Sequence, residues 1–354
     1  MTDLEKLCSR VTEAADCAVI TDDVNRRYFT AMKSSAGTLV VFPEKAYFII
    51  DFRYIEKAKK TVTACEVILQ DKLYEQINSL IEKHGAKTVS VNADTCTLSE
   101  LIAYQQKLNA EVIADTKLAK IITEIRTVKS QDQIDKIIKA QRIAEKGFAH
   151  MLDFIKVGRT EKEIQLELDY YMLRNGAEAL SFDTIALSGS NTSLPHGVPS
   201  DKKVESGEFV LMDFGATYDG WHSDMTRTVC VGKPSDKMKS VYETVLTAQL
   251  SALDAVKAGM SGKALDKIAR DIITEAGYGD NFGHSLGHGV GVEIHESPYA
   301  SPSRKDILPE NSIVTVEPGI YLEGKFGVRI EDFVVVTENG CINMTKAPKE
   351  LICL

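Results

Sequence analysis

The second half of the chain contains the same pattern twice, and this internal repeat restricts the possible folds more than any other feature. The segment KVGRTEKEI at 156–164 aligns with KAGMSGKAL at 257–265, and each is followed by a glycine that ends a predicted helix, Gly176 and Gly277. Self-similarity of this kind indicates that one structural unit is present twice. We therefore predict two copies of a unit made of two helices and a hairpin, related by a pseudo-two-fold axis.

Each copy ends in a predicted hairpin that carries one acidic residue on each strand. The first hairpin is FVLMDFGATYDGWHSDMTRTVCV at 209–231, and the second is IVTVEPGIYLEGKFGVRIEDFVVV at 313–336. The acidic residues at corresponding positions are Asp213 and Asp224 in the first hairpin and Glu317 and Glu331 in the second. The apolar runs before the first acid of each hairpin indicate that these strands lie in the interior.

The turn of the first hairpin predicts where its acids point. Asp219-Gly220 is a favoured two-residue turn, and it pairs Asp213 with Thr226. Asp224 then lies on the same face as Asp213, one diagonal step away. Four carboxylates that converge in the interior would repel one another and take up protons unless cations neutralised them. Four negative charges match two divalent ions.

A solvated or salt-bridged role is the alternative for each of these acids. Arg227 and Arg329 each lie near an acid in the sequence and are candidate salt-bridge partners. The paired arrangement of the acids nevertheless favours a metal site. One histidine added to four carboxylates suits Mn, Co, Fe or Zn at two adjacent positions, where a bridging water is activated as hydroxide.

The stretch GHSLGHGVGVEIHE at 283–296 holds three of the seven histidines of the chain. Its HSLGH spacing matches a helical zinc pair, but the glutamate of that motif is missing and the glycines disfavour a helix. The glycines also lack the spacing of a dinucleotide-binding loop. We expect instead that they let the backbone pack close against a neighbouring segment, as a loop that enters a metal centre requires.

A boundary near residue 125 divides the chain into a predicted α/β domain at 1–125 and a second domain at 126–354. In the first domain β-rich runs alternate with helical patterns, and this order is typical of an α/β fold. The β-rich runs are 17–21, 38–43, 47–52 and 88–94, and the helical patterns are 73–84 and 97–107.

Two capping boxes predict the first two helices of the second domain. Ser130 with Gln133 opens one helix, and Thr160 with Glu163 opens another that runs to Gly176. Both helices belong to the first copy of the repeated unit.

The composition excludes several classes of protein. A net charge of −9 without a basic block argues against nucleic acid as a partner, and no apolar run approaches the roughly 20 residues that span a bilayer. Seven cysteines without a CxxC pair fit a reducing compartment. The start MTDLEKLCSR lacks the pattern of a secretory signal. We therefore expect a cytoplasmic protein that binds neither nucleic acid nor a membrane.

Taken together, the motifs resemble those of metallopeptidases with the pita-bread fold of methionine aminopeptidase and creatinase. The resemblance rests on DFGATYDGWHSDMTRT, GHGVGVEIHE, VEPGIY and GVRIED, and on SGSNTSLPHGVP at 188–199. With an α/β domain ahead of these motifs, the chain is similar to the aminopeptidase P and prolidase branch over essentially its full length. The resemblance implies a creatinase-like α/β N-terminal domain and an α+β pita-bread catalytic domain with an internal duplication.

The resemblance also implies a centre of two divalent metal ions, with manganese expected and cobalt or zinc as alternatives. Asp224 and Glu331 would bridge both ions. The implied metal ligands are Asp213, Asp224, His288, Glu317 and Glu331.

Further side chains correspond to family residues that contact the substrate or its intermediate. His196 and His295 resemble the two active-site histidines that do not bind metal, and His284 matches a histidine near the site in the aminopeptidase P group. Arg329 would orient a carboxylate. Glu317 is the candidate for carrying the proton of the attacking water. Trp221 and His222, at a hairpin tip, are expected to be structural.

The activity that this resemblance implies is release of an N-terminal residue from peptides with proline at the second position. We expect an Xaa-Pro aminopeptidase, because the compact chain resembles small bacterial enzymes of that type. The alternative is an Xaa-Pro dipeptidase, which needs a cation for the free carboxylate of proline, and Arg304 lies near where prolidases carry one. A metal-free creatinase-like hydrolase and a non-catalytic binding protein are disfavoured by the complete ligand set. We expect a homodimer, and a folding role only for DFRY at 51–54.

Overall fold

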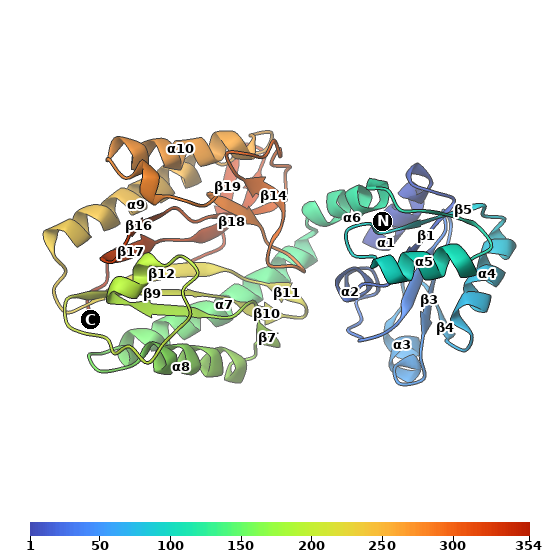
Figure 1. Ribbon diagram of the computed structural model, residues 1–354, viewed down its shortest axis with the longest axis horizontal. Helices are drawn as coiled ribbons and strands as arrows, with labels where there is room; N and C mark the ends of the chain where they lie inside the picture. The colour runs from blue at the N-terminus through green and yellow to red at the C-terminus, as the bar shows by residue number, and fades with distance from the viewer. The chain divides into compact units, whose positions relative to one another are not determined.

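The computed structural model describes residues 1–354, which divide into two compact units, Met1–Arg126 and Thr127–Leu354. The first unit, blue to teal in Figure 1, contains one mixed sheet with helices packed around it. The strand order is β4 (Glu66–Leu69), β3 (Ala46–Ile50), β2 (Thr38–Val41), β1 (Cys17–Ile20), β5 (Thr88–Val91) and β6 (Glu111–Ile113). The helices are α1 (Asp3–Arg10), η1 (Val11–Glu13), α2 (Asp23–Thr30), α3 (Ile55–Thr61), α4 (Leu73–His84), α5 (Leu98–Lys107) and α6 (Lys117–Thr127).

The sheet of the first unit is buried on both faces. Residues of β1 alternate between two apolar clusters: Ala18 and Ile20 pack with side chains of α1 and α2, whereas Cys17 and Val19 pack with side chains of α4 and α5. This burial explains why the strands appear in the sequence as continuous apolar runs. The four strands and two helices predicted here are confirmed. The prediction missed the edge strands β4 and β6, which are partly exposed and each begin with glutamate.

The second unit contains the repeated helix, helix and hairpin pattern. The first copy consists of α7 (Gln131–Phe154), α8 (Glu161–Arg174), β7 (Ala179–Leu180), β8 (Ile185–Ser188), η2 (Gly189–Ser193), β9 (Glu208–Phe214), β10 (Ala216–Tyr218), β11 (Trp221–His222) and β12 (Met225–Val231). The second copy consists of α9 (Asp236–Ala255), α10 (Gly262–Glu275), η3 (Gly279–Asn281), β13 (Gly287–Gly289), β14 (Glu296–Ala300), β15 (Ile313–Val316), β16 (Gly319–Leu322), β17 (Phe326–Arg329), β18 (Asp332–Thr337) and β19 (Gly340–Asn343).

The predicted duplication is confirmed by the equivalent order of elements in the two copies. In Figure 1 the helices α7 and α8 lie on one side of the strands of this unit, and α9 and α10 lie on the other. Side chains of α7 and α8 form one apolar core with β9 and β12, and side chains of α9 and α10 form another with β15 and β18. Both predicted capping boxes are present at the starts of α7 and α8. The hairpin strands are therefore held between two pairs of helices.

The first hairpin has the predicted register. Asp219 and Gly220 both have positive φ angles, 49° and 82°, as a two-residue turn between twisted strands requires. Asp213 on β9 pairs with Thr226 on β12. Asp224 lies between β11 and β12 and directly precedes β12.

The second hairpin places its two acids opposite each other. Val316 pairs with Asp332 in β15 and β18, and Gly319 pairs with Arg329 in β16 and β17. Glu317 and Glu331 occupy matching positions between these pairs. Among the helices of both units, none is long and apolar enough to cross a membrane.

Candidate metal centre

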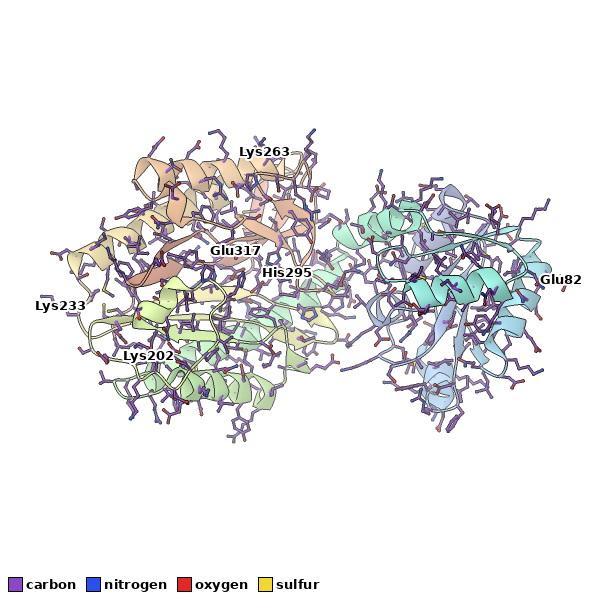
Figure 2. All side chains as sticks on the ribbon, viewed as in Figure 1. Glu82, Lys202, Lys233, Lys263, His295 and Glu317 are labelled. Carbon is purple, nitrogen blue, oxygen red and sulfur yellow. The ribbon has the colours of Figure 1, made fainter.

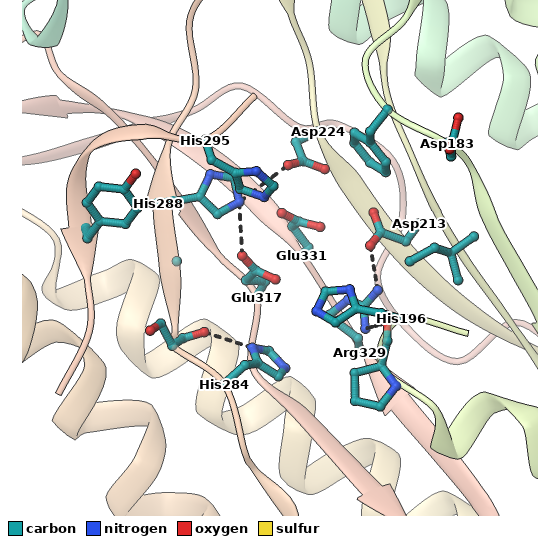
Figure 3. A pocket seen from close by; sticks show the side chains of 16 residues that line it. Asp183, His196, Asp213, Asp224, His284, His288, His295, Glu317, Arg329 and Glu331 are labelled. Carbon is teal, nitrogen blue, oxygen red and sulfur yellow. Dashed lines mark hydrogen bonds and ion pairs between the residues drawn. The ribbon is translucent and has the colours of Figure 1, made fainter. Parts of the chain in front are cut away.

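The five predicted metal ligands come from five separate places in the second unit and line one cavity of about 510 Å³. Asp213 lies near the end of β9, and His288 is the middle residue of β13. Asp224, Glu317 and Glu331 each lie directly beside a strand, next to β12, β15 and β18. Figure 2 shows Glu317 and His295 in the body of this unit, between the two layers of helices. Figure 3 shows the acids and histidines of the cavity from close by.

Three of these residues form a compact buried group. Ligand atoms of Asp224, His288 and Glu331 all lie within 4.8 Å of one another, and these residues are 4%, 9% and 1% exposed. His288 Nε2 is 3.6 Å from Asp224 Oδ2 and 3.3 Å from Glu317 Oε1. His288 Nδ1 donates a hydrogen bond to the Gly289 carbonyl at 3.0 Å. This bond leaves Nε2 directed at the carboxylates, as in a histidine that binds metal through Nε2.

Two buried carboxylate oxygens in the cavity have no hydrogen-bond partner. They are Asp213 Oδ1 and Glu331 Oε1. A buried anionic oxygen without a partner costs free energy, so such atoms are rare unless a cation or water binds them. Both atoms belong to predicted ligands, and their lone pairs fit the hard or borderline divalent ions that carboxylates bind.

The pKa values of the group reflect burial and repulsion between its carboxylates. Burial, together with the charges of Asp213 and Glu317, raises the pKa of Asp224 well above its usual value, and burial with the charge of Asp224 does the same for Glu331. Burial lowers the pKa of His288, but its hydrogen bond to Glu317 and the nearby carboxylates outweigh burial and raise that pKa to about 9. Divalent ions would favour the ionised carboxylates and the neutral imidazole instead. The donor set therefore fits a metal centre.

Arg329 connects three of the polar side chains around the cavity. Its Nη2 donates to Asp213 Oδ2 at 2.5 Å, its Nη1 to the Tyr321 hydroxyl at 2.7 Å, and its Nε to Thr226 Oγ1 at 3.0 Å. Thr226 in turn donates to Glu331 Oε2 at 2.7 Å. The guanidinium thus bonds to Asp213 directly and reaches Glu331 through Thr226, an arrangement that can orient both carboxylates.

The other three predicted histidines line the same cavity but differ in their hydrogen bonding. His284 uses both ring nitrogens, because Nδ1 donates to the Ser285 carbonyl at 2.8 Å and Nε2 accepts from the Tyr321 hydroxyl at 2.9 Å. His196 and His295 are exposed and have no hydrogen bond within the protein. Burial lowers the pKa of His284 and, with the charge of His288, that of His295. His196 and His295 are therefore the two histidines with ring nitrogens available to a substrate.

Arg304, predicted to contact the substrate, lies at the edge of the site and not on the cavity wall. Its guanidinium carbon lies 4.2 Å from the centre of the Tyr299 ring, and Tyr299 does line the cavity. Trp221 and His222, expected to be structural, do not line the cavity.

Several cavity residues were not identified from the sequence. They are Phe182, Asp183, Ile185, Pro195, Ser285, Gly287 and Tyr299. The signal available for Asp183 was its place in SFDT at 181–184, a few residues before the segment 188–199. Its carboxylate is exposed and has no hydrogen bond or ion pair within the protein. Tyr321, which binds both Arg329 and His284, was overlooked although it belongs to the VEPGIY motif.

Close backbone packing explains two of the glycines around His288. A Cβ atom on Gly287 would lie 1.9 Å from the Thr315 carbonyl oxygen, and one on Gly289 would lie 2.4 Å from the Ser297 carbonyl oxygen. The Thr315 hydroxyl also accepts a hydrogen bond from the His288 N–H at 3.0 Å. The expectation that the glycines permit close approach is confirmed, and it is this approach that brings His288 to the acids.

The whole chain is similar to known proteins. Residues 135–338 match the model of metallopeptidase family M24, and residues 4–128 match the creatinase/prolidase N-terminal domain.

An Xaa-Pro dipeptidase of Pyrococcus furiosus is 39% identical over 352 residues, which cover 99% of each chain. The structure of an Xaa-Pro dipeptidase from Bacillus anthracis superposes with a TM-score of 0.96 at 41% identity, covering 99% of each chain. That of an X-Pro aminopeptidase from Thermotoga maritima gives 0.89 at 38% identity, covering 96% of this chain and 98% of the other. By these matches, the chain belongs to metallopeptidase family M24 and carries a creatinase/prolidase N-terminal domain.

Proposed function

We propose that the protein is an Xaa-Pro dipeptidase, which hydrolyses the bond between an N-terminal residue and a C-terminal proline. The observation that carries this proposal is the cation at the edge of the cavity, Arg304, stacked on the cavity residue Tyr299. Relatives that cover nearly the whole chain are named Xaa-Pro dipeptidases, which supports the same choice. The compact length of the chain led us to expect an aminopeptidase, with the dipeptidase and its Arg304 as the alternative, and the named relatives favour that alternative.

The proposal includes two divalent ions, with manganese as the expected metal. The residues that would hold them are Asp213, Asp224, His288, Glu317 and Glu331. When bound, such ions lower the pKa of a water molecule and polarise the carbonyl group of a peptide bond.

The remaining steps depend on the side chains of the chain itself. The nitrogen of proline is part of a tertiary amide. Like any amide nitrogen, it must receive a proton as the C–N bond breaks, because the unprotonated nitrogen is a poor leaving group. Glu317 is the proposed carrier of that proton, because its Oε1 faces the interior of the cavity beside His288. His196 and His295 would each donate a ring N–H to the developing oxyanion or to the substrate backbone. Arg329 keeps Asp213 and Glu331 in place during these steps.

The substrates of a dipeptidase and of an aminopeptidase differ in the group attached to the carbonyl carbon of proline. A dipeptide ends in a carboxylate, for which an arginine is a suitable partner, whereas a longer peptide continues with a neutral amide. Arg304 is exposed and free to pair with that carboxylate while its planar group rests on Tyr299. Because this cation would contribute only when a carboxylate is present, it favours the shorter substrate.

The test compares hydrolysis of Ala-Pro with that of Ala-Pro-Ala by the manganese-loaded protein. A kcat/KM at least about 10-fold higher for Ala-Pro supports the dipeptidase, since charge-assisted pairing contributes on the order of 1.5–3 kcal/mol. Equal or faster hydrolysis of Ala-Pro-Ala would instead establish an Xaa-Pro aminopeptidase, the second candidate, which the similarity to the Thermotoga maritima structure favours. Hydrolysis of neither peptide would reject both.

A further inference from the structure

The segment Ser188–Ser200 brings His196 to the cavity, and both ends of the segment meet at one buried carboxylate. His196 is exposed and has no hydrogen bond within the protein, so its position depends on the backbone that carries it. Glu161, the first residue of α8, is 0% exposed and lies against this segment. Glu161 is not a cavity residue, and the proposed reaction does not use it.

The hydrogen-bond donors to the Glu161 carboxylate all come from this one segment. At the near end, Oε1 accepts from the Ser188 N–H at 2.7 Å and from the Ser188 hydroxyl at 3.2 Å. At the far end, Oε2 accepts from the Ser200 N–H at 2.9 Å and from the Ser200 hydroxyl at 2.6 Å. Asn191 Nδ2 donates to both oxygens, at 3.0 and 3.2 Å. An ionised carboxylate is an acceptor only, so it matches this set of donors.

No salt bridge fixes Glu161. Lys202 joins the network by donating to the Ser188 hydroxyl at 3.1 Å, but its salt bridge is with Glu208 at 2.7 Å. The start of α8 adds favourable partial positive charge at the position of Glu161. The hydrogen bonds from Ser188, Asn191 and Ser200 therefore fix the carboxylate and the segment relative to each other.

The middle of the segment is attached to β17, next to the metal centre. The Gly327 N–H donates to Thr192 Oγ1 at 2.8 Å, and a Cβ atom on Gly327 would lie 2.2 Å from the Thr192 carbonyl oxygen. Arg329 Nη1 approaches the Pro195 carbonyl at 3.5 Å. With its ends tied by Glu161 and its centre seated on β17, the segment has little freedom to move His196 away from the cavity.

We propose that Glu161 is a positioning residue for His196: by accepting hydrogen bonds from both ends of Ser188–Ser200, it sets where the imidazole stands in the cavity. The inference rests on the proposed function in one respect, since His196 is taken to contact the substrate. Glu161 itself does not contact the substrate or the metal ligands.

The second repeat ties its histidine segment in a related way. Asp266 on α10 is 1% exposed and accepts from the Leu286 N–H at 3.0 Å. Arg270 pairs with Asp266 at 2.7 Å and donates to the Phe282 and His284 carbonyls at 2.9 and 2.8 Å. In that copy an arginine and an aspartate both bind the backbone of the segment, whereas in the first copy Glu161 is the one charged side chain that binds the backbone at both ends of its segment. Removing the charge of Glu161 should therefore loosen the His196 segment and leave the His284 segment unchanged.

The first test is hydrogen–deuterium exchange of the manganese-loaded protein with Glu161→Gln. The amide NH2 of glutamine would face N–H and O–H donors, so at least two of the six hydrogen bonds are lost. We expect amides in 189–199 to exchange at least about 10-fold faster, while metal content and exchange in β9 and β13 stay unchanged. The control is Glu163→Gln on the same helix, because glutamine also serves at the third position of a capping box. Unchanged exchange in 189–199 would overturn the proposal.

The second test is a double-mutant cycle with His196→Ala, using hydrolysis of Ala-Pro. Glu161→Gln should lower kcat/KM about 10- to 100-fold in the wild-type background, since a displacement of about 1 Å has effects of this size. In the His196→Ala background it should change kcat/KM by less than about 2-fold, because coupled residues are not additive. Equal losses in both backgrounds would show that Glu161 does not act through His196. If Glu161→Gln does not fold, Ser200→Ala is used instead, because it removes only the hydroxyl donor of Ser200. It should lower kcat/KM for Ala-Pro by a smaller factor. An unchanged kcat/KM would count against the proposal.

The two tests separate this inference from the proposed function. If the wild-type protein hydrolyses neither Ala-Pro nor Ala-Pro-Ala, the proposed function fails. The exchange comparison between Glu161→Gln and Glu163→Gln still decides whether Glu161 holds the segment.

Discussion

Thr226 donates a hydrogen bond to Glu331 at 2.7 Å and thereby joins the two copies of the repeated hairpin at the metal centre. The same hydroxyl accepts from Arg329 Nε, and it is 0% exposed. Thr226→Val keeps the shape of the side chain but removes both hydrogen bonds. We expect the affinity for manganese to fall about 10- to 100-fold, as is usual when a group that orients a ligand is lost. Metal titration followed by calorimetry measures this change.

The matched control for that change is Thr228→Val, two residues further along β12. Thr228 is equally buried, but its hydroxyl bonds to the backbone of Arg329 and not to a carboxylate. Both variants should lose roughly 1–3 kcal/mol of stability, because each leaves buried polar groups without a partner. If Thr228→Val weakened manganese binding as much as Thr226→Val, the link from Thr226 to Glu331 would not be the cause.

Removal of metal should make stability depend on pH. The folded-state pKa values of Asp224 and Glu331 lie well above their usual values because of burial and neighbouring carboxylates, so both groups bind protons on folding. His288, with a pKa raised to about 9, binds a proton in the same direction. Stability from these three groups is present at low pH and is lost as pH rises through their folded pKa values. Glu317 has the opposite effect, because its pKa is lowered to about 2. The stability that Glu317 contributes is therefore lost only as the pH falls toward that value.

The measurement is the unfolding temperature of chelator-treated and manganese-loaded protein between about pH 5 and 8. We expect the metal-free protein to lose at least about 4 °C relative to the loaded protein over this range, since about 1 kcal/mol shifts Tm by 2–4 °C in a domain of this size. If the difference in unfolding temperature between the metal-free and the manganese-loaded protein did not change with pH, the raised pKa values of these carboxylates would not contribute to stability.

Much of the fold was predictable because its signals are local. The turn at Asp219-Gly220 fixes the register that pairs Asp213 with Thr226, and the capping boxes fix where α7 and α8 begin. These features depend on residues a few positions apart. The larger unit of two helices and a hairpin was recognisable because its pattern occurs twice in the sequence. The matching family motifs then identified the four acids and the histidine that line the cavity as candidate ligands.

What the sequence did not reveal depends on contacts between distant residues. Glu161 is 27 residues from Ser188 and 39 from Ser200, and only the folded segment shows that one carboxylate serves both. The hydroxyl of Tyr321 on β16 likewise bonds to Arg329 on β17 and to His284 in the loop before β13. No period or motif encodes such pairings, because the hydrogen-bond partners are set by tertiary packing.

Loss of a ligand and loss of a substrate-contacting histidine should have different consequences. Asp224→Ala removes a buried carboxylate of the compact group, so we expect it to abolish manganese binding and with it turnover. His295→Ala removes an exposed imidazole without a hydrogen bond in the protein, so metal content should stay as in the wild type. Its kcat should fall about 100- to 1000-fold, as for other oxyanion donors. Elemental analysis beside Ala-Pro hydrolysis measures both, and loss of metal in both variants would contradict the assigned roles.

Arg304 should determine the preference for dipeptides. It lies over the Tyr299 ring at the edge of the cavity, where it would pair with the carboxylate of a C-terminal proline. Because a charge-assisted hydrogen bond contributes about 1.5–3 kcal/mol, Arg304→Ala should raise KM for Ala-Pro about 10- to 100-fold and leave that for Ala-Pro-Ala nearly unchanged. Lys305→Ala is the matched control, since it removes a neighbouring exposed cation of the same charge. An equal increase for both peptides in the Arg304 variant would indicate that the arginine supports the cavity wall through Tyr299 and does not recognise the carboxylate.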